Sequence, residues 1–199
     1  MIALFAQCYH TALTRDIPQK PGVLCLGDSI RLGWSKYLEI PGHEIVSPPD
    51  NGRRLANGLK RFPTWAGKRQ WHIILAGFGL HDLKHRVVND TATGQITSPE
   101  EYRRLLIQFI VFVQSTQKDA RLYWILMTPG GDEARTVELV QRYNDIAKNV
   151  CRLKKVKTID LFSLALKHPE WRDGIHFTEA GYKAFADLIR SEIWFTPPG

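Results

Sequence analysis

Short apolar runs alternate with longer amphipathic segments along this chain, and no other feature constrains its fold as strongly. Three of the runs, at 22–26, 71–77 and 121–128, are nearly continuous in apolar residues. That composition is typical of strands whose two faces are both covered by other elements. Weaker strand candidates lie at 43–47 and 156–161. Strands that alternate with helices form βαβ units, so we predict an α/β protein with a parallel sheet and helices on both faces.

The segments between these runs carry helix start signals. The clearest pattern covers 98–117, where Ser98 occupies the N-cap and Glu101 follows three residues later in a capping-box arrangement. The longest polar stretch, 84–97, is predicted to be a loop that borders a site. Two further helices are predicted, over 132–153 and 178–194.

Length and composition fit a single domain over residues 1–199, with an N-terminal extension at 1–21 and a core at 22–194. No apolar run approaches the roughly 18 residues that a membrane span needs. The first residues lack the basic region and cleavage site of a signal peptide. The cysteines are few and widely spaced, which indicates no disulfide framework, so we expect a cytoplasmic protein. They are Cys8, Cys25 and Cys151.

The formal net charge is +7 at pH 7. The basic residues are dispersed along the chain in pairs such as Arg53-Arg54 and Arg103-Arg104. They form no long basic run and no nucleic-acid-binding motif. Solvated helix faces and loops account for this distribution, so we expect no nucleic-acid partner.

Reactive side chains are expected at the carboxyl ends of the strands, because parallel sheets of this type bind ligands there. The run at 22–26 ends in Gly27-Asp28-Ser29, directly before an amphipathic segment. Gly, Asp and Ser are common turn residues, so the tripeptide alone favours a polar turn. It also suits a nucleophilic serine beside the N-H groups that begin a helix. The second interpretation requires a base elsewhere in the chain, because a serine hydroxyl is a poor nucleophile unaided.

A candidate base and its orienting acid stand together near the C-terminus. Asp173 and His176 are three residues apart, immediately before the helix predicted at 178–194. With this spacing Asp173 can accept a hydrogen bond from Nδ1 of His176, which leaves Nε2 free to take the proton of Ser29. The alternative is a helix-capping loop with a surface histidine. A metal site that adds His81 and Asp82 to this pair is also conceivable, but it leaves the serine unexplained.

Glycines follow two other strand candidates. Gly52 comes after the run at 43–47, and Gly79 comes after the run at 71–77. Glycine permits close backbone approach, and a tetrahedral intermediate needs two or three N-H donors aimed at its oxyanion. For Gly52 a plain Asn51-Gly52 turn is an equal alternative.

Together these motifs resemble the SGNH hydrolases, also called the GDSL esterase/lipase family. The resemblance covers roughly residues 22–194 and rests on four motifs in order: Gly27-Asp28-Ser29, Asn51-Gly52, Gly79-x-x-Asp82 and Asp173-x-x-His176. It implies a flavodoxin-like three-layer α/β/α sandwich with a central, mainly parallel five-stranded sheet. It also implies that Ser29 is the nucleophile and His176 its base. Asp173 is then the orienting acid, and Gly52 donates a backbone N-H to the oxyanion.

One position departs from the family pattern. The third motif usually reads Gly-x-Asn-Asp, with the asparagine side chain as an oxyanion donor, whereas this chain has His81 in that place. A histidine can still donate through a ring N-H in the right tautomer. The alternatives are a residue on the rim of the site or a catalytically weak protein. Asp82 is expected to be structural, bonding loop amides.

The function that these residues predict is a serine esterase without cofactor or metal. Its substrate is expected to be a short acyl or acetyl ester of a small molecule or glycan, contacted by Asn51, Arg53 and Gly79. An acyltransferase or thioesterase on the same scaffold, or a binding pseudoenzyme, is the alternative. The α/β-hydrolase elbow Gly-x-Ser-x-Gly is not met, because Arg31 stands in place of its second glycine. A dinucleotide-binding or P-loop fingerprint is also missing from the sequence.

Overall fold

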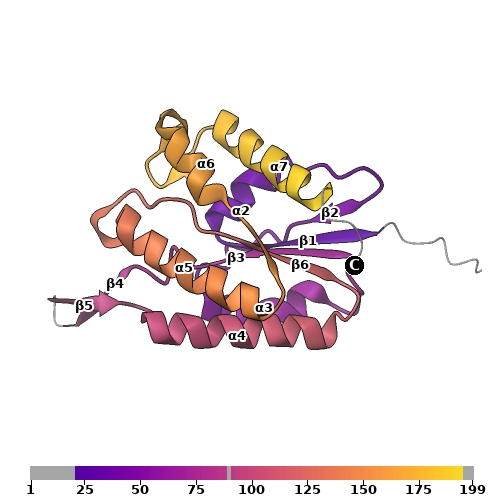
Figure 1. Cartoon of the computed structure of the whole chain (residues 1–199), viewed down its shortest axis with the longest axis horizontal. Coiled ribbons are helices and arrows are strands. Elements are labelled where there is room, and N and C mark those ends of the chain that lie inside the picture. The colour runs from indigo at the N-terminus through magenta and orange to yellow at the C-terminus, as the bar shows by residue number, and fades with distance from the viewer. Residues whose placement is uncertain (1–20, 89–90, 195–199) are drawn as a thin grey trace, which may run out of the picture.

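A computed structural model describes residues 21–88 and 91–194. Its centre is a sheet of five strands in the order β2-β1-β3-β6-β7, and every neighbouring pair is parallel (Figure 1). The predicted five-stranded sheet is therefore confirmed. Its strands are β1 (Gly22–Gly27), β2 (Glu44–Val46), β3 (Ile73–Gly77), β6 (Arg121–Ile125) and β7 (Lys157–Ile159). The predicted N-terminal extension, including Cys8, lies outside the described residues as far as residue 20.

Helices cover both faces of this sheet and complete the predicted three layers (Figure 1). One layer packs α3 against α4 and α4 against α5, and the other packs α7 between α2 and α6. The first layer comprises α3 (Leu55–Ala66), α4 (Pro99–Thr116) and α5 (Val137–Leu153). The second comprises α2 (Ser29–Trp34), α6 (Leu161–Lys167) and α7 (Glu179–Trp194).

The hydrophobic core lies between the sheet and the two helical layers. In the central strands β1 and β3, Val23, Leu24, Ile73 and Ile74 have no exposed surface, as expected of strands covered on both faces. Phe78, which follows β3, packs its ring against Phe109 of α4 and Trp124 of β6. The buried aromatic cluster fixes the chain just beyond the carboxyl end of β3.

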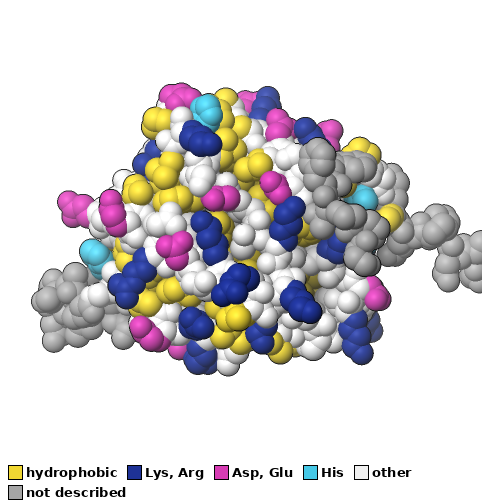
Figure 2. Space-filling model, viewed as in Figure 1, with side chains coloured by type: hydrophobic (Ala, Val, Ile, Leu, Met, Phe, Trp, Pro, Cys, Tyr) yellow, Lys and Arg dark blue, Asp and Glu magenta, His cyan; other side chains and the backbone are white. Residues whose placement is uncertain are grey.

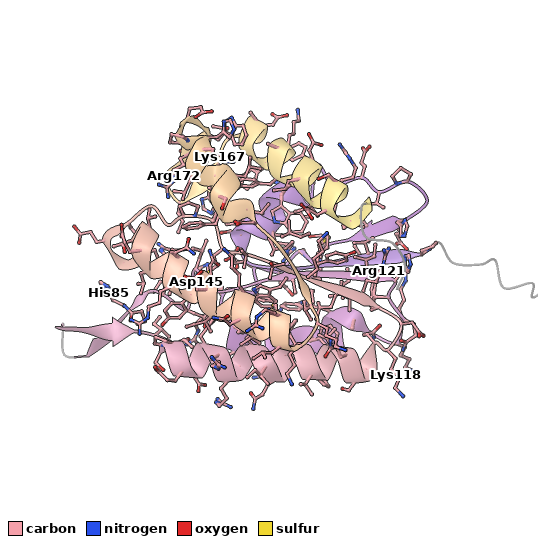
Figure 3. The ribbon with its side chains drawn as sticks, viewed as in Figure 1. His85, Lys118, Arg121, Asp145, Lys167 and Arg172 are labelled. Carbon is pink, nitrogen blue, oxygen red and sulfur yellow. The ribbon has the colours of Figure 1, made fainter. Side chains whose placement is uncertain are left out.

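The prediction of a plain loop over 84–97 is wrong. This stretch contains an antiparallel hairpin of β4 (His85–Val88) and β5 (Thr91–Gln95), which projects from one end of the molecule (Figure 1). Figure 3 labels His85 at the base of this projection. The hairpin forms its own two-stranded sheet and does not join the central one.

Two further differences concern helices. The segment predicted as one helix over 132–153 is a 3₁₀ turn at Glu133–Arg135 followed by α5. The break falls at Thr136, whose hydroxyl caps α5 by accepting the Leu139 N-H at 3.2 Å. Helix α3 was not predicted, since Gly58 and Pro63 weaken its helical signal.

No helix within the two described ranges is long and apolar enough to cross a membrane.

The N-cap of α4 gives a direct test of local stability. Ser98 accepts the Glu101 N-H at 3.2 Å, so Ser98→Ala should lower the free energy of unfolding by about 1 kcal/mol. Ser98→Asp keeps an acceptor at the cap and should retain wild-type stability. Urea unfolding followed by circular dichroism measures both variants. Equal losses in the two variants would contradict the assignment of this cap.

Candidate active site

The carboxyl end of β1 presents Ser29 at the first position of α2. Asp28 caps this helix by accepting the Ile30 N-H on its carboxylate at 2.9 Å. Burial raises the pKa of the Asp28 carboxyl to about 6, although the bond from Ile30 and the charge of Arg31 oppose the rise. Within the described residues no acceptor takes the N-H of Ser29. The sequence therefore folds here into a strand–helix junction that leaves both the hydroxyl and the N-H of Ser29 available.

Ser29 and His176 meet across the fold. Nε2 of His176 lies 2.9 Å from Oγ of Ser29, although 147 positions separate the two residues. His176 stands in a short antiparallel hairpin of β8 (Arg172–Asp173) and β9 (His176–Phe177), just before α7. Phe177 anchors this hairpin by packing against Phe185 of α7, with ring centroids 4.8 Å apart. The predicted serine–histidine contact is thus present in the structure.

The predicted acid of the triad is less well engaged. Asp173 is exposed and pairs with His176 across the β8–β9 hairpin. Among the described residues no hydrogen bond joins its carboxylate to Nδ1 of His176. The structure therefore brings Asp173 beside the histidine without the bond that an orienting acid makes.

Gly52 lies against the end of β1. Its N-H donates to the carbonyl of Gly27 at 3.0 Å, so the predicted oxyanion donor already has an acceptor. A Cβ at Gly52 would stand 2.7 Å from that same carbonyl oxygen, which explains the need for glycine. Asn51, predicted to contact substrate, accepts the N-H of Arg53 on its side chain at 2.9 Å. The loop between β2 and α3 is thereby held close to Ser29.

The loop after β3 carries the histidine that departs from the family pattern. Gly79, predicted to contact substrate, has φ 147 and is buried, and a Cβ there would meet the Met127 side chain. His81 is half-buried. Burial, together with the smaller effect of the charges on Lys84, Arg135, Arg53 and His176, lowers the pKa of its imidazole to about 4. His81 is therefore neutral at pH 7, with one ring nitrogen able to donate and the other to accept.

Asp82 has the structural role that its position suggested. Its carboxylate is fully buried and accepts the Leu55 N-H at 3.0 Å and the Thr97 hydroxyl at 2.7 Å. Leu55 is the first residue of α3, and the N-cap side chain of that helix, Arg54, makes no capping bond. Asp82 therefore caps α3 from a distant loop. It connects the loop of Gly52 to the loop of His81.

Sequence reasoning missed Arg31. Its side chain is 2% exposed and makes no ion pair in the described structure; its guanidinium instead donates to four oxygens. The acceptors are the Ser47 hydroxyl (2.7 Å) and the carbonyls of Pro48 (2.6 Å), Asp50 (2.5 Å) and Gly27 (3.4 Å). Arg31 thus joins the end of β1 to the loop that leads to Gly52. Nothing in the sequence distinguishes it from a solvated arginine on an amphipathic helix.

His176 is exposed and Ser29 is half-buried, so this pair lies at the surface of the described structure. A cavity beneath Asp28 is bounded by α2 and by the ends of β3 and β6, but its walls include neither Ser29 nor His176. It has room for about one water molecule. In the part of the chain that the structure covers, His, Cys, Asp and Glu side chains form no group of three or more that could hold a metal ion.

The three-layer fold, with a serine–histidine contact at the carboxyl edge of its parallel sheet, defines the class of serine hydrolases. A family model described as the GDSL-like Lipase/Acylhydrolase family matches residues 25–184. The chain belongs to this family and is a GDSL-type serine hydrolase acting on ester bonds. No curated protein matches the sequence significantly.

Several solved structures share the fold at low sequence identity. A lipase/acylhydrolase from Enterococcus faecalis is 20% identical, with 87% of this chain and 95% of that one covered at a TM-score of 0.67. An acetyl xylan esterase is 17% identical, with 86% and 99% covered and a TM-score of 0.67. A member of the lipolytic protein G-D-S-L family from Veillonella parvula is 16% identical, with 88% and 99% covered and a TM-score of 0.69.

The contacts of Arg31 predict a loss of turnover when its guanidinium is removed. Arg31→Met leaves several loop oxygens without their donor, so kcat should fall by about tenfold or more while KM changes little. Arg31→Lys keeps a donor and should recover part of kcat. Esterase kinetics and thermal unfolding are measured on each variant. A fall in melting temperature at constant kcat would assign Arg31 to stability alone.

Arg61→Met is the matched control for this experiment. Arg61 binds the same loop through the Asp50 carboxylate at 2.5 Å, but both side chains are more than a third exposed. An exposed pair of this kind contributes about 0–1 kcal/mol, so Arg61→Met should retain wild-type kcat.

Proposed function

We propose that this protein is a serine esterase that forms an acyl-enzyme on Ser29. The observation that carries the proposal is the 2.9 Å approach of His176 Nε2 to the Ser29 hydroxyl. A hydrogen bond of this length lets the imidazole take the hydroxyl proton as the oxygen attacks an ester carbonyl.

The reaction then follows two half-steps on His176. In the first, a bond forms between Ser29 Oγ and the ester carbon, and the proton moves to Nε2. That proton passes to the departing alcohol as the ester C–O bond breaks. In the second half-step a water gives a proton to Nε2 as its oxygen attacks the acyl carbon. The bond from that carbon to Ser29 Oγ then breaks, the acid departs, and Nε2 returns the proton to Oγ. Asp173 stabilises the imidazolium by turning its carboxylate to Nδ1 across the hairpin.

Three donors are proposed for the oxyanion. The N-H of Ser29 is available at the start of α2, and the neutral ring of His81 donates from the loop after β3. Gly52 contributes by sharing its N-H between the Gly27 carbonyl and the oxyanion. His81 thereby replaces the asparagine that this family usually carries in the third motif.

The proposed substrate is a short acyl or acetyl ester of a small molecule or glycan. The open site between loops suits a small acyl group, because the cavity beneath it does not extend from Ser29. The acetyl xylan esterase with the same fold supports a glycan ester as one member of this class. Asn51 and Arg53 stand on the loop beside Gly52, where they can meet the alcohol portion.

A binding protein without turnover is the second candidate. The observations that favour it are the engaged N-H of Gly52 and the missing bond between Asp173 and His176. A fluorophosphonate probe distinguishes the two, because covalent labelling requires an activated serine. Labelling of wild type and not of Ser29→Ala supports the esterase, whereas an unlabelled wild type supports the binding protein.

Ser29→Ala should abolish turnover of p-nitrophenyl acetate and butyrate. Without the nucleophile no acyl-enzyme forms, so kcat should drop by about 10⁴-fold or more. His176→Ala should cause a loss of similar size, and the two losses should not add. The visible absorbance of the released p-nitrophenolate measures the turnover of each variant. Turnover of Ser29→Ala at the wild-type rate contradicts the mechanism.

Substitution of His81 tests the proposed donor. His81→Ala should lower kcat by about 10²–10³-fold, as removal of an oxyanion donor does elsewhere. His81→Asn restores the donor usual in the family and should stay within about tenfold of wild type. Because the pKa of His81 is about 4, both wild type and His81→Asn should show the same pH profile between about pH 5 and 8. Equal kcat in wild type and His81→Ala would show that His81 lies on the rim of the site and does not act as an oxyanion donor.

A further inference from the structure

Arg53 holds a backbone conformation that its residue type does not favour. Its φ is 56, in the left-handed region where glycine, asparagine and aspartate are the usual residues. Lys155 has a similar φ of 55, but it stands directly after α5. There, the bonds from Val156 N-H to Cys151 and from Lys155 N-H to Arg152 form a helix-ending motif that requires this conformation.

No such helix-ending motif accounts for the left-handed conformation of Arg53. It precedes α3 and is held by the bond from its N-H to the Asn51 side chain. An asparagine or glycine would adopt this turn with less strain. Strained residues are concentrated at functional sites, where a side chain is needed in a particular place. Arg53 immediately follows Gly52, whose backbone is bonded to the end of β1 two residues before Ser29.

The Arg53 side chain is exposed and makes no ion pair within the described structure. Lys84, three residues after His81, is also exposed and unpaired there. Arg53 follows Gly52 in the β2–α3 loop and Lys84 follows Asp82 in the loop after β3, and the bond from the Leu55 N-H to the Asp82 carboxylate joins these two segments. Both charges also contribute to the lowered pKa of the His81 imidazole.

The neighbouring charges do not cancel these two. Asp132 also interacts electrostatically with Lys84, but its carboxylate forms an ion pair with Arg135, and the charge of Asp50 is balanced by Arg61. The Asp82 carboxylate is buried and bonded to Leu55 and Thr97. Asp173 is exposed and, in the mechanism above, balances the charge that forms on His176. The edge of the site formed by the Gly52 and His81 loops is therefore positive.

We propose that Arg53 and Lys84 bind an anionic oxygen group of the substrate, so that the preferred esters carry a carboxylate or phosphate near the scissile bond. This inference rests on the proposed esterase function and specifies its substrate class. Arginine suits the role because its guanidinium can engage two oxygens of a carboxylate or phosphate at once. Lysine adds a point charge from the loop after β3.

A matched pair of esters tests the proposal. 4-Acetoxybenzoate and its methyl ester have the same acetyl group to be removed and differ in one negative charge. 4-Acetoxyphenyl phosphate distinguishes a preference for phosphate from one for carboxylate. The ratio of kcat/KM for the anionic ester to that for the neutral ester is measured in wild type and variants at low and high salt.

Arg53→Asn removes the charge and keeps a residue that accepts the left-handed turn. The anionic-to-neutral ratio should fall roughly tenfold in Arg53→Asn and in Lys84→Gln, and added salt should lower the ratio in wild type. Arg53→Lys should keep most of the ratio. Arg53→Asn should unfold at a temperature no lower than wild type, because the backbone strain is relieved.

Lys118→Gln is the control variant. Figure 3 labels Lys118 at the end of the molecule opposite to His85 and Arg172, so its loss should leave the ratio unchanged. If wild type cleaves the neutral ester through Ser29 and the ratio does not change in Arg53→Asn or Lys84→Gln, this inference is overturned and the esterase function stands. If neither ester is cleaved through Ser29, both fail together.

Discussion

The carbonyl oxygen of Gly27 is the point on which the site depends. Gly27 is the last residue of β1. Its carbonyl oxygen accepts one hydrogen bond from the Gly52 N-H at 3.0 Å and another from the Arg31 guanidinium at 3.4 Å. A side chain on Gly27 would meet the Gly77 carbonyl of the next strand at 2.6 Å. The end of β1, which precedes Ser29, is thus tightly packed against β3 and against the β2–α3 loop. Glycine at positions 27 and 52 allows the end of β1 to approach β3 and the β2–α3 loop this closely.

Buried side chains of α4 and α5 hold the backbone just beyond the ends of β3 and β6. The Tyr102 hydroxyl donates to the Phe78 carbonyl at 2.9 Å, just after β3. The Asn144 side chain both donates to and accepts from the backbone of Met127, just after β6, at 2.9 Å in each case. Buried polar groups need partners, so each of these bonds also specifies how the helix sits on the sheet. The site loops are positioned by the core as much as by their own sequence.

Charge is distributed so that the site differs from the rest of the surface. On the face shown in Figure 2, Lys and Arg side chains over α4 and α5 are interspersed with acidic and apolar ones. This matches the dispersed pattern of the sequence. Around His81, by contrast, neither Arg53 nor Lys84 forms an ion pair in the described structure, and burial keeps the imidazole neutral. The positions of Arg53 and Lys84 are therefore more informative about binding than the net charge of the chain.

The sequence by itself determined the sheet, its covered strands, most helices and the order of the four motifs, because apolar periodicity and capping residues are local signals. It also identified Ser29 and His176 as partners, through a family resemblance. Only the tertiary structure decided how the loops are joined. Strands β4 and β5 pair with each other and not with the central sheet, and the four acceptors of Arg31 come from other parts of the chain. The bond that occupies the Gly52 N-H is likewise set by packing between strand ends, a long-range constraint that no local pattern encodes.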